Sequence, residues 1–192
     1  MIQTKKRTFL WLTGGLVFSL LVLLVVSTGL SGNVLITDPE GIPETTDAVM
    51  NCIRSGDWMT LEGLVTGNPA LAPVTGEEGT AENLIWNAYQ QSLQWVYEEE
   101  FDIQDSYVIQ TVTVTCLDIS GVTGIIARIL QEPAFIAANS ESALLAATEE
   151  VLHADVPTIQ KEITLTLARE NGRWLVVPNS ALLALLSGFT AH

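Results

Sequence analysis

The spacing of hydrophobic residues changes several times along the chain, and each change predicts a boundary between structural elements. The first segment is an unbroken apolar run at 8–30, "TFLWLTGGLVFSLLVLLVVSTGL", which contains no charged residue. At 1.5 Å per helical residue, this run is long enough to cross a hydrocarbon core of roughly 30 Å. We therefore predict a transmembrane anchor. A cleaved signal peptide is the alternative, because Ser27 and Gly29 are small enough for a processing site.

Beyond residue 44 the apolar residues recur with the period of a helix. Thr45 or Thr46 is a suitable cap for a helix that a left-handed Gly56 would end. Asp57 is placed to cap a second, short helix, and Thr80 to cap a third. The sequence thus predicts three helices before the first strand.

The pattern then changes from helical period to strand-like alternation. Runs at 93–103 and 107–117 are separated by "QDS", which predicts a tight antiparallel hairpin. A second hairpin is predicted where the dipeptide Asn171-Gly172 separates two further alternating runs. Between the hairpins, at 118–155, the period is helical again, so a helical insertion is expected there.

Charge is distributed unevenly along the 192 residues, whose net charge is -14. Three of the eight basic residues, "KKR", directly precede the apolar run, and every acidic residue lies at Asp38 or later. The positive-inside rule then keeps the N-terminus in the cytoplasm and places the rest outside. With five basic and 22 acidic residues, that outer part would repel phosphate backbones, so we expect no nucleic-acid partner.

These features divide the chain into four parts. They are a basic cytoplasmic tail at 1–7, the anchor at 8–30, a linker at 31–44, and one extracytoplasmic α+β domain at 45–192. The expected location is therefore the cell membrane, crossed once, with the C-terminal domain extracytoplasmic.

Two short motifs carry a resemblance to a known family. They are "RSGDW" between the first two helices and "ENGRWLVV" in the last hairpin, and with the order of elements they cover the stretch 45–178. The chain resembles the nuclear-transport-factor-two-like (NTF2-like) family, whose cone-shaped α+β fold includes ketosteroid isomerase and polyketide cyclases. It resembles most of all bacterial members with one anchor and one such domain outside. The resemblance implies a bent antiparallel sheet packed on helices, with a pocket at its wide end.

Three consecutive glutamates at 98–100 lie inside the first predicted hairpin and have two interpretations. On an unbroken strand, Glu99 shares a face with apolar neighbours, namely Trp95, Tyr97, Phe101 and Ile103. A carboxylate in such surroundings could serve as a base or acid near neutral pH. If a bulge instead interrupts the strand, the phase shifts, Val96, Phe101 and Ile103 point inward, and all three glutamates face water. The sequence favours the bulge, because runs of charge usually lie on solvated faces.

Four aromatic residues near the junction of the third helix and the first strand are candidates to line a pocket: Trp86, Trp95, Tyr97 and Phe101. If the domain is an enzyme, the candidate bases are Glu99 and Asp118, the latter at the end of the second strand. The resemblance places no catalytic residue of the family on this sequence.

No metal or cofactor is expected. The acidic stretch "EEEFDIQD" lacks the glycine turn of a calcium loop, and the two histidines, His153 and His192, are too far apart for a zinc site. Cys52 and Cys116 would pair if the first helix packs on the second strand, and otherwise they would be buried free thiols, which we favour.

Two classes of function remain open. The first is a membrane-tethered binding module that holds a small ligand, a peptide or an envelope protein. It would use the cone pocket or a row of threonines at 111, 113 and 115, and that row could also serve a homodimer. The second is a small isomerase- or cyclase-like enzyme with a carboxylate base. The lack of any familiar catalytic motif favours binding.

Overall fold

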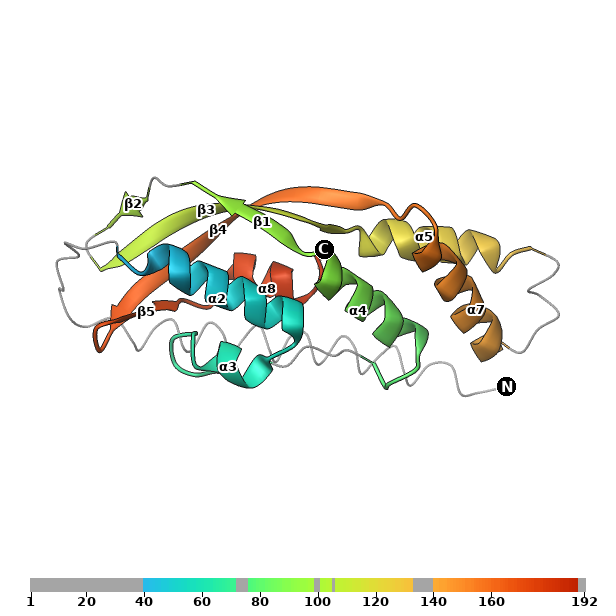
Figure 1. Ribbon diagram of the computed structural model, residues 1–192, viewed down its shortest axis with the longest axis horizontal. Helices are drawn as coiled ribbons and strands as arrows, with labels where there is room; N and C mark the ends of the chain where they lie inside the picture. Colours follow the sequence, from blue (N-terminus) through green and yellow to red (C-terminus); the bar gives the residue numbers. More distant parts are fainter. Residues whose placement is uncertain (1–39, 72–75, 99–100, 105, 133–139, 190–192) are drawn as a thin grey trace, which may run out of the picture.

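A computed structural model of the protein describes residues 40–71, 76–98, 101–104, 106–132 and 140–189. It shows an α+β domain in which a curled antiparallel sheet packs on helices, as predicted (Figure 1). The predicted anchor at 8–30 lies outside the described residues. Within those residues, no helix is both long enough and apolar enough to cross a membrane.

The sheet contains two antiparallel hairpins in the predicted order. Its strands are β1 (Gln94–Tyr97), β2 (Asp102–Ile103), β3 (Tyr107–Leu117), β4 (Thr158–Glu170) and β5 (Arg173–Val176). They are arranged β1-β3-β4-β5, and β2 pairs with β3 beyond the end of β1. The long strands β3 and β4 pair over their whole common length, from Tyr107 opposite Ala168 to Leu117 opposite Thr158.

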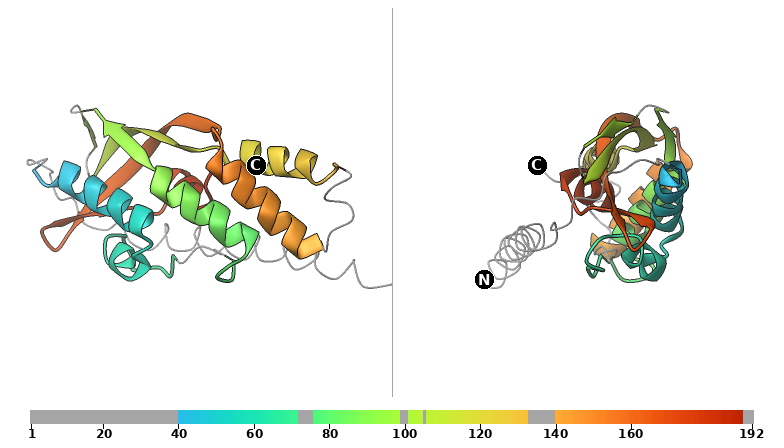
Figure 2. Two further views of the ribbon diagram at one scale, coloured as in Figure 1. Left: turned by 45° about the vertical axis from the view of Figure 1, so that its right-hand side comes forward. Right: turned by 90° about the vertical axis from the view of Figure 1, so that its left-hand side faces the viewer.

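The helices divide into an inner group and an insertion. The inner group is α2 (Ile42–Ser55), α3 (Trp58–Glu62), α4 (Ala81–Ser92) and α8 (Ser180–Leu186). The insertion between the hairpins is α5 (Ile119–Ile129) and α7 (Ser140–His153). In the views shown, the inner helices lie on one side of the sheet, and α5 and α7 extend beyond the end of β3 and β4 (Figures 1 and 2).

Helix capping confirms two of the predictions and corrects one. Asp57 accepts the backbone N–H of Thr60 at 3.1 Å, and the Thr80 hydroxyl accepts that of Asn83 at 3.3 Å, so both cap as expected. The helix α2, however, begins at Ile42 after a left-handed Gly41, with a proline in its first turn, which is a favoured position for proline. Neither Thr45 nor Thr46 caps it, and the helix begins at least four residues earlier than predicted.

The core lies between the sheet and the inner helices. Alternate residues of the long strands point into it, and the buried ones include Val108, Val112, Val114, Leu165 and Leu167. From the helices, Met50, Ile53 and Tyr89 are completely buried against them. Apolar packing of this kind is the main favourable term in folding. The described inner face of the sheet is therefore filled by side chains.

The first strand of the first hairpin is interrupted. Tyr97 lies opposite Val112 and Asp102 lies opposite Ile109, so five steps along one strand match three steps along its partner. Two extra residues are thus inserted into the first strand of this hairpin, and the interpretation of an unbroken strand is wrong. Because the insertion is two residues rather than one, the side-chain alternation is preserved.

The predicted change of phase across this bulge is therefore wrong. Trp95, Tyr97 and Phe101 are all half-buried, whereas Val96 is 73% exposed. Ile103 lies opposite the buried Val108 and shares their face, although it is 50% exposed. Glu98 faces solvent. Glu99 and its neighbour at 100 lie outside the described residues, so the environment of Glu99 stays a prediction.

Candidate functional site

A cluster of polar contacts joins α2 to the edge strand β1. One carboxylate oxygen of Asp47 accepts the indole N–H of Trp95 at 2.7 Å, and the other accepts the Tyr97 hydroxyl at 3.2 Å. The guanidinium carbon of Arg54 lies 4.9 Å from the centroid of the Trp95 ring, within cation–π range. Three electrostatic contacts therefore connect this helix to the edge strand.

The secondary structure explains why these groups meet. Trp95 and Tyr97 are two positions apart on a strand, so both side chains point to the same face. Asp47 and Arg54 are seven positions apart, which is close to two helical turns, so they lie on one side of α2. Burial raises the pKa of the Tyr97 hydroxyl, and the negative charges of Asp47 and Glu44 raise it further. Tyr97 therefore keeps its proton and remains a donor to Asp47.

This arrangement contains two of the four aromatic residues predicted to line a pocket. Trp86 is instead buried on α4, with its ring centroid 5.1 Å from that of Tyr89. Its indole nitrogen has no hydrogen-bond partner among the described residues. Phe101 is half-buried and packs at the margin of the core, just after the bulge. Asp47 was missed, because a single acidic residue on a helix shows no pattern that points to a partner in a strand.

Asp118, one of the two candidate bases, lies at the turn between β3 and α5. Its backbone N–H donates to the carbonyl of Pro157 at 2.9 Å, and its carbonyl accepts the N–H of Val122 at 2.9 Å. Its carboxylate rests against Gly121, where a Cβ atom would come within 2.6 Å of Oδ2. These contacts are those of a helix start, where a negative charge is favourable. They favour a structural role for Asp118.

Buried polar groups connect the inner helices to one another and to β3. The Thr46 hydroxyl donates to Oε1 of Gln110, and both residues are completely buried. The Nε2 group of Gln110 has no partner among the described residues. Elsewhere, Gln90 donates to the carbonyl of Ile53 at 2.6 Å, and the Tyr89 hydroxyl donates to the carbonyl of Leu185 at 2.7 Å. No sequence pattern indicates these contacts.

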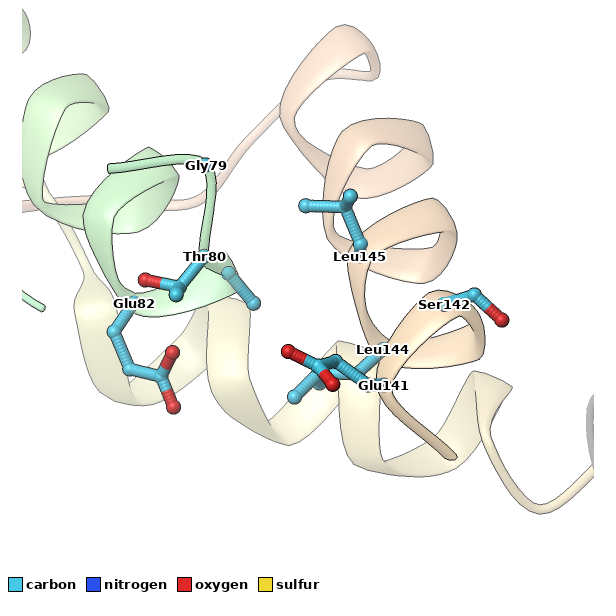
Figure 3. A pocket seen from close by; sticks show the side chains of 8 residues that line it. Gly79, Thr80, Glu82, Glu141, Ser142, Leu144 and Leu145 are labelled. Atoms are coloured by element: carbon cyan, nitrogen blue, oxygen red, sulfur yellow. The ribbon is translucent and has the colours of Figure 1, made fainter. Parts of the chain in front are cut away.

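An open cleft of about 590 Å³ separates the start of α4 from the start of α7 (Figure 3). It is lined by Gly79, Thr80, Ala81, Glu82, Glu141, Ser142, Leu144 and Leu145. Leu145 points from α7 toward α4, while Glu82 and Glu141 approach the gap from opposite walls (Figure 3). One wall belongs to the helical insertion, so the insertion creates an opening that lies away from the inner face of the sheet.

The threonine row lies on the outer face of the sheet, opposite to the inner helices. Thr111 pairs directly with Thr164, whereas Thr166 pairs with Ile109. Thr113 lies between Val96 of β1 and Glu162 of β4. This face is therefore polar, with an exposed valine at its β1 border.

The cysteines and histidines have structural surroundings. Cys52 and Cys116 are both free and buried, which agrees with the free-thiol alternative. Burial raises the pKa of both thiols, that of Cys116 to about 11. His153 lies in the last turn of α7, with Nδ1 2.7 Å from the carbonyl oxygen of Glu149. Across the described ranges, no three side chains of histidine, cysteine, aspartate or glutamate are grouped to hold a metal ion.

Comparison with known proteins finds no matching family model and no matching curated protein. Two solved structures are similar in shape. One is a candidate dehydratase of the NTF2-like family from Streptomyces avermitilis, at 15% identity and a TM-score of 0.36, over 76% of this chain and 99% of that one. The other is a candidate lipoprotein from Bacillus subtilis, at 14% identity and a TM-score of 0.39, over 74% of this chain and 46% of that one.

Proposed function

We propose that this protein is a membrane-anchored, extracytoplasmic interaction module with an NTF2-like fold. The anchor and its orientation rest on the charge-free run at 8–30 and on the three basic residues before it. The motifs "RSGDW" and "ENGRWLVV" and the order of elements support the fold family, and a curled antiparallel sheet packed on helices is compatible with it.

The packing of the inner face carries the proposal. The polar residues buried in the described domain are Thr46, Gln90, Gln110 and Thr148, which are hydroxyl and amide groups. An enzyme of the isomerase type needs a desolvated carboxylate next to a hydrogen-bond donor. The cleft described above instead lies between α4 and α7, and within the part of the chain that the structure describes, β1 has one edge without a partner strand. Both favour recognition at the periphery of the domain.

A small isomerase- or cyclase-like enzyme is the second candidate, and one observation favours it. Asp47 is a carboxylate directly beside the hydroxyl of Tyr97, a combination that acid–base catalysis can use. However, both oxygens of Asp47 already accept hydrogen bonds from β1 side chains. This geometry suits a carboxylate that holds the edge strand in place.

The test compares the free energy of unfolding of two matched variants, Glu99→Gln and Glu98→Gln, at neutral pH. For an interaction module, both variants should stay within about 1 kcal/mol of the parent, as is usual at solvated positions. If Glu99 is instead a buried base, Glu99→Gln alone should raise stability near neutral pH, because a buried charge is removed. That result would favour the enzyme.

A further inference from the structure

The edge strand β1 has one side without a partner strand among the described residues. Its other side pairs with β3. At the opposite end of the sheet, the outer edge of β5 is covered, because Val176 exchanges backbone hydrogen bonds of 2.9 Å with Leu64 and Thr66. Uncovered strand edges present free N–H and C=O groups that pair readily with another strand.

The pairing with β3 determines which backbone groups point outward. The N–H of Glu98 donates to the carbonyl of Thr111, which lies opposite it, at 3.3 Å. Hydrogen-bonded pairs alternate along an antiparallel ladder, so Val96 also directs its backbone groups toward β3. Trp95 and Tyr97 therefore direct their N–H and C=O groups toward the open edge.

The composition of this edge is unusual for a protein with so much negative charge. The strand "QWVY" has no charged residue and no proline, which are common means of protecting an edge. Val96, near its centre, is 73% exposed on the outer face. The bulge and Glu98 follow immediately and limit the open edge to a short strand of four residues. The strand is thus short, uncharged and available.

We propose that β1 pairs in an antiparallel manner with β1 of a second copy of this chain, with Val96 on the two-fold axis. This deepens the proposed function, on which it rests, by naming one partner of the interaction module. In this register Trp95 of one copy lies opposite Tyr97 of the other, and Gln94 lies opposite Glu98. Val96 lies opposite its own counterpart, so the two exposed valines cover each other.

Side-chain pairing selects this register. No two like charges are opposed within it. A shift by two residues in either direction places Val96 opposite Gln94 or Glu98, and the valine–valine contact is lost. Asp47 already holds the side chains of Trp95 and Tyr97 in one conformation, so less conformational entropy is lost when a second strand docks. A self-complementary edge of this kind is best matched by the same edge.

The register can be tested by introducing one additional, exposed cysteine into the full chain, which is kept in detergent micelles. Val96 and its counterpart would form a pair without mutual hydrogen bonds, with Cα atoms about 4.5 Å apart. This separation lies within the range for a disulfide, about 4.4–6.8 Å. Val96→Cys should therefore form a disulfide-linked dimer under mild oxidation, while the buried native cysteines leave the parent unlinked.

Gln94→Cys is the matched control, because it retains the anchor and lies on the same strand face. The two thiols introduced by Gln94→Cys would be four positions apart along the ladder, about 13 Å, too far for a disulfide. We expect Val96→Cys to cross-link on the order of tenfold faster. Equal rates for the two variants would overturn the proposal. If Glu99→Gln and Glu98→Gln then behave alike, the interaction module stands and only self-pairing fails.

A second measurement uses the parent protein. The two copies are negatively charged, so salt should reduce their mutual repulsion and raise the dimer fraction in sedimentation velocity. Val96→Lys should abolish the dimer by placing two like charges opposite each other, and the substitution is compatible with folding because the position is exposed. A Val96→Lys variant that dimerises like the parent would contradict the proposal.

Discussion

Asp47 accepts the indole N–H of Trp95 at 2.7 Å, and this contact joins two residues that are 48 positions apart in the chain. It fixes the first strand of the sheet to the first helix of the domain. The same carboxylate also accepts the Tyr97 hydroxyl. Replacement of Asp47 by alanine would leave two ring donors without their acceptor, and we expect it to lower the free energy of unfolding by about 1–3 kcal/mol.

The control for Asp47→Ala is Glu44→Gln, on the same helix but exposed. Chemical denaturation followed by tryptophan fluorescence measures both variants. Glu44→Gln should match the parent. If the two substitutions have equal effects, the contact with Trp95 contributes nothing measurable and the role of Asp47 as an anchor is wrong.

The buried pair of Thr46 and Gln110 predicts strong non-additivity. Thr46→Val alone removes the only partner that the Gln110 side chain has among the described residues, and should cost about 1–3 kcal/mol. The double variant with Gln110→Leu removes both polar groups and should be closer to the parent than the sum of the single variants. A double-mutant cycle measures the coupling. Additive single effects would show that the hydroxyl and the amide do not interact.

Stability should fall at alkaline pH. Burial raises the pKa of Cys116 from its ordinary value of 9.0 to about 11, and it raises the pKa of Cys52 and Tyr89 as well. A raised pKa means that the folded state retains the proton after the unfolded chain has lost it. The contribution to stability is therefore complete below pH 9 and is lost as the pH rises toward 11 and beyond.

Denaturation curves at several pH values between about 8 and 11 measure this slope. Cys116→Ala removes one of the groups that titrate in this window, so its slope should be shallower than that of the parent. An identical slope in both proteins would exclude Cys116 as a source of the alkaline instability.

The predicted membrane anchor and its orientation are tested by a reporter fused after His192. The basic residues before the apolar run predict that everything beyond it is extracytoplasmic. A reporter that is active only outside the cytoplasm should therefore be active, and one that requires the cytoplasm should be silent. Strong cytoplasmic activity would contradict the predicted topology.

The helices, hairpins and caps could be predicted from the sequence because those features depend on local pattern. Asp57 and Thr80 cap as their spacing indicates, and Asn171-Gly172 forms the predicted turn. Two local details were wrong for physical reasons. The start of α2 is determined by Gly41 and a proline rather than by a threonine cap, and the bulge inserts two residues where one was expected.

The contacts of the candidate site could not be predicted in the same way. Asp47 meets Trp95 only because α2 packs across the inner face of β1, and that packing depends on the whole core. Similarly, Thr46 and Gln110 are both polar residues at inward positions, and only the tertiary fold brings them together. Local pattern identified Trp95 and Tyr97 as candidates, but it could not identify their partner.

The central claim is that the domain recognises a partner rather than catalyses a reaction, and the ionisation of Glu99 tests it most directly. A pH titration of the Glu99 side-chain carboxyl carbon, followed by NMR, reports this ionisation without any assumption about a ligand. For an interaction module with solvated glutamates after β1, Glu99 should titrate near the ordinary glutamate value of about 4.3. A Glu99 pKa raised well above that value, toward neutral pH, would indicate a desolvated carboxylate able to transfer protons and would contradict the account.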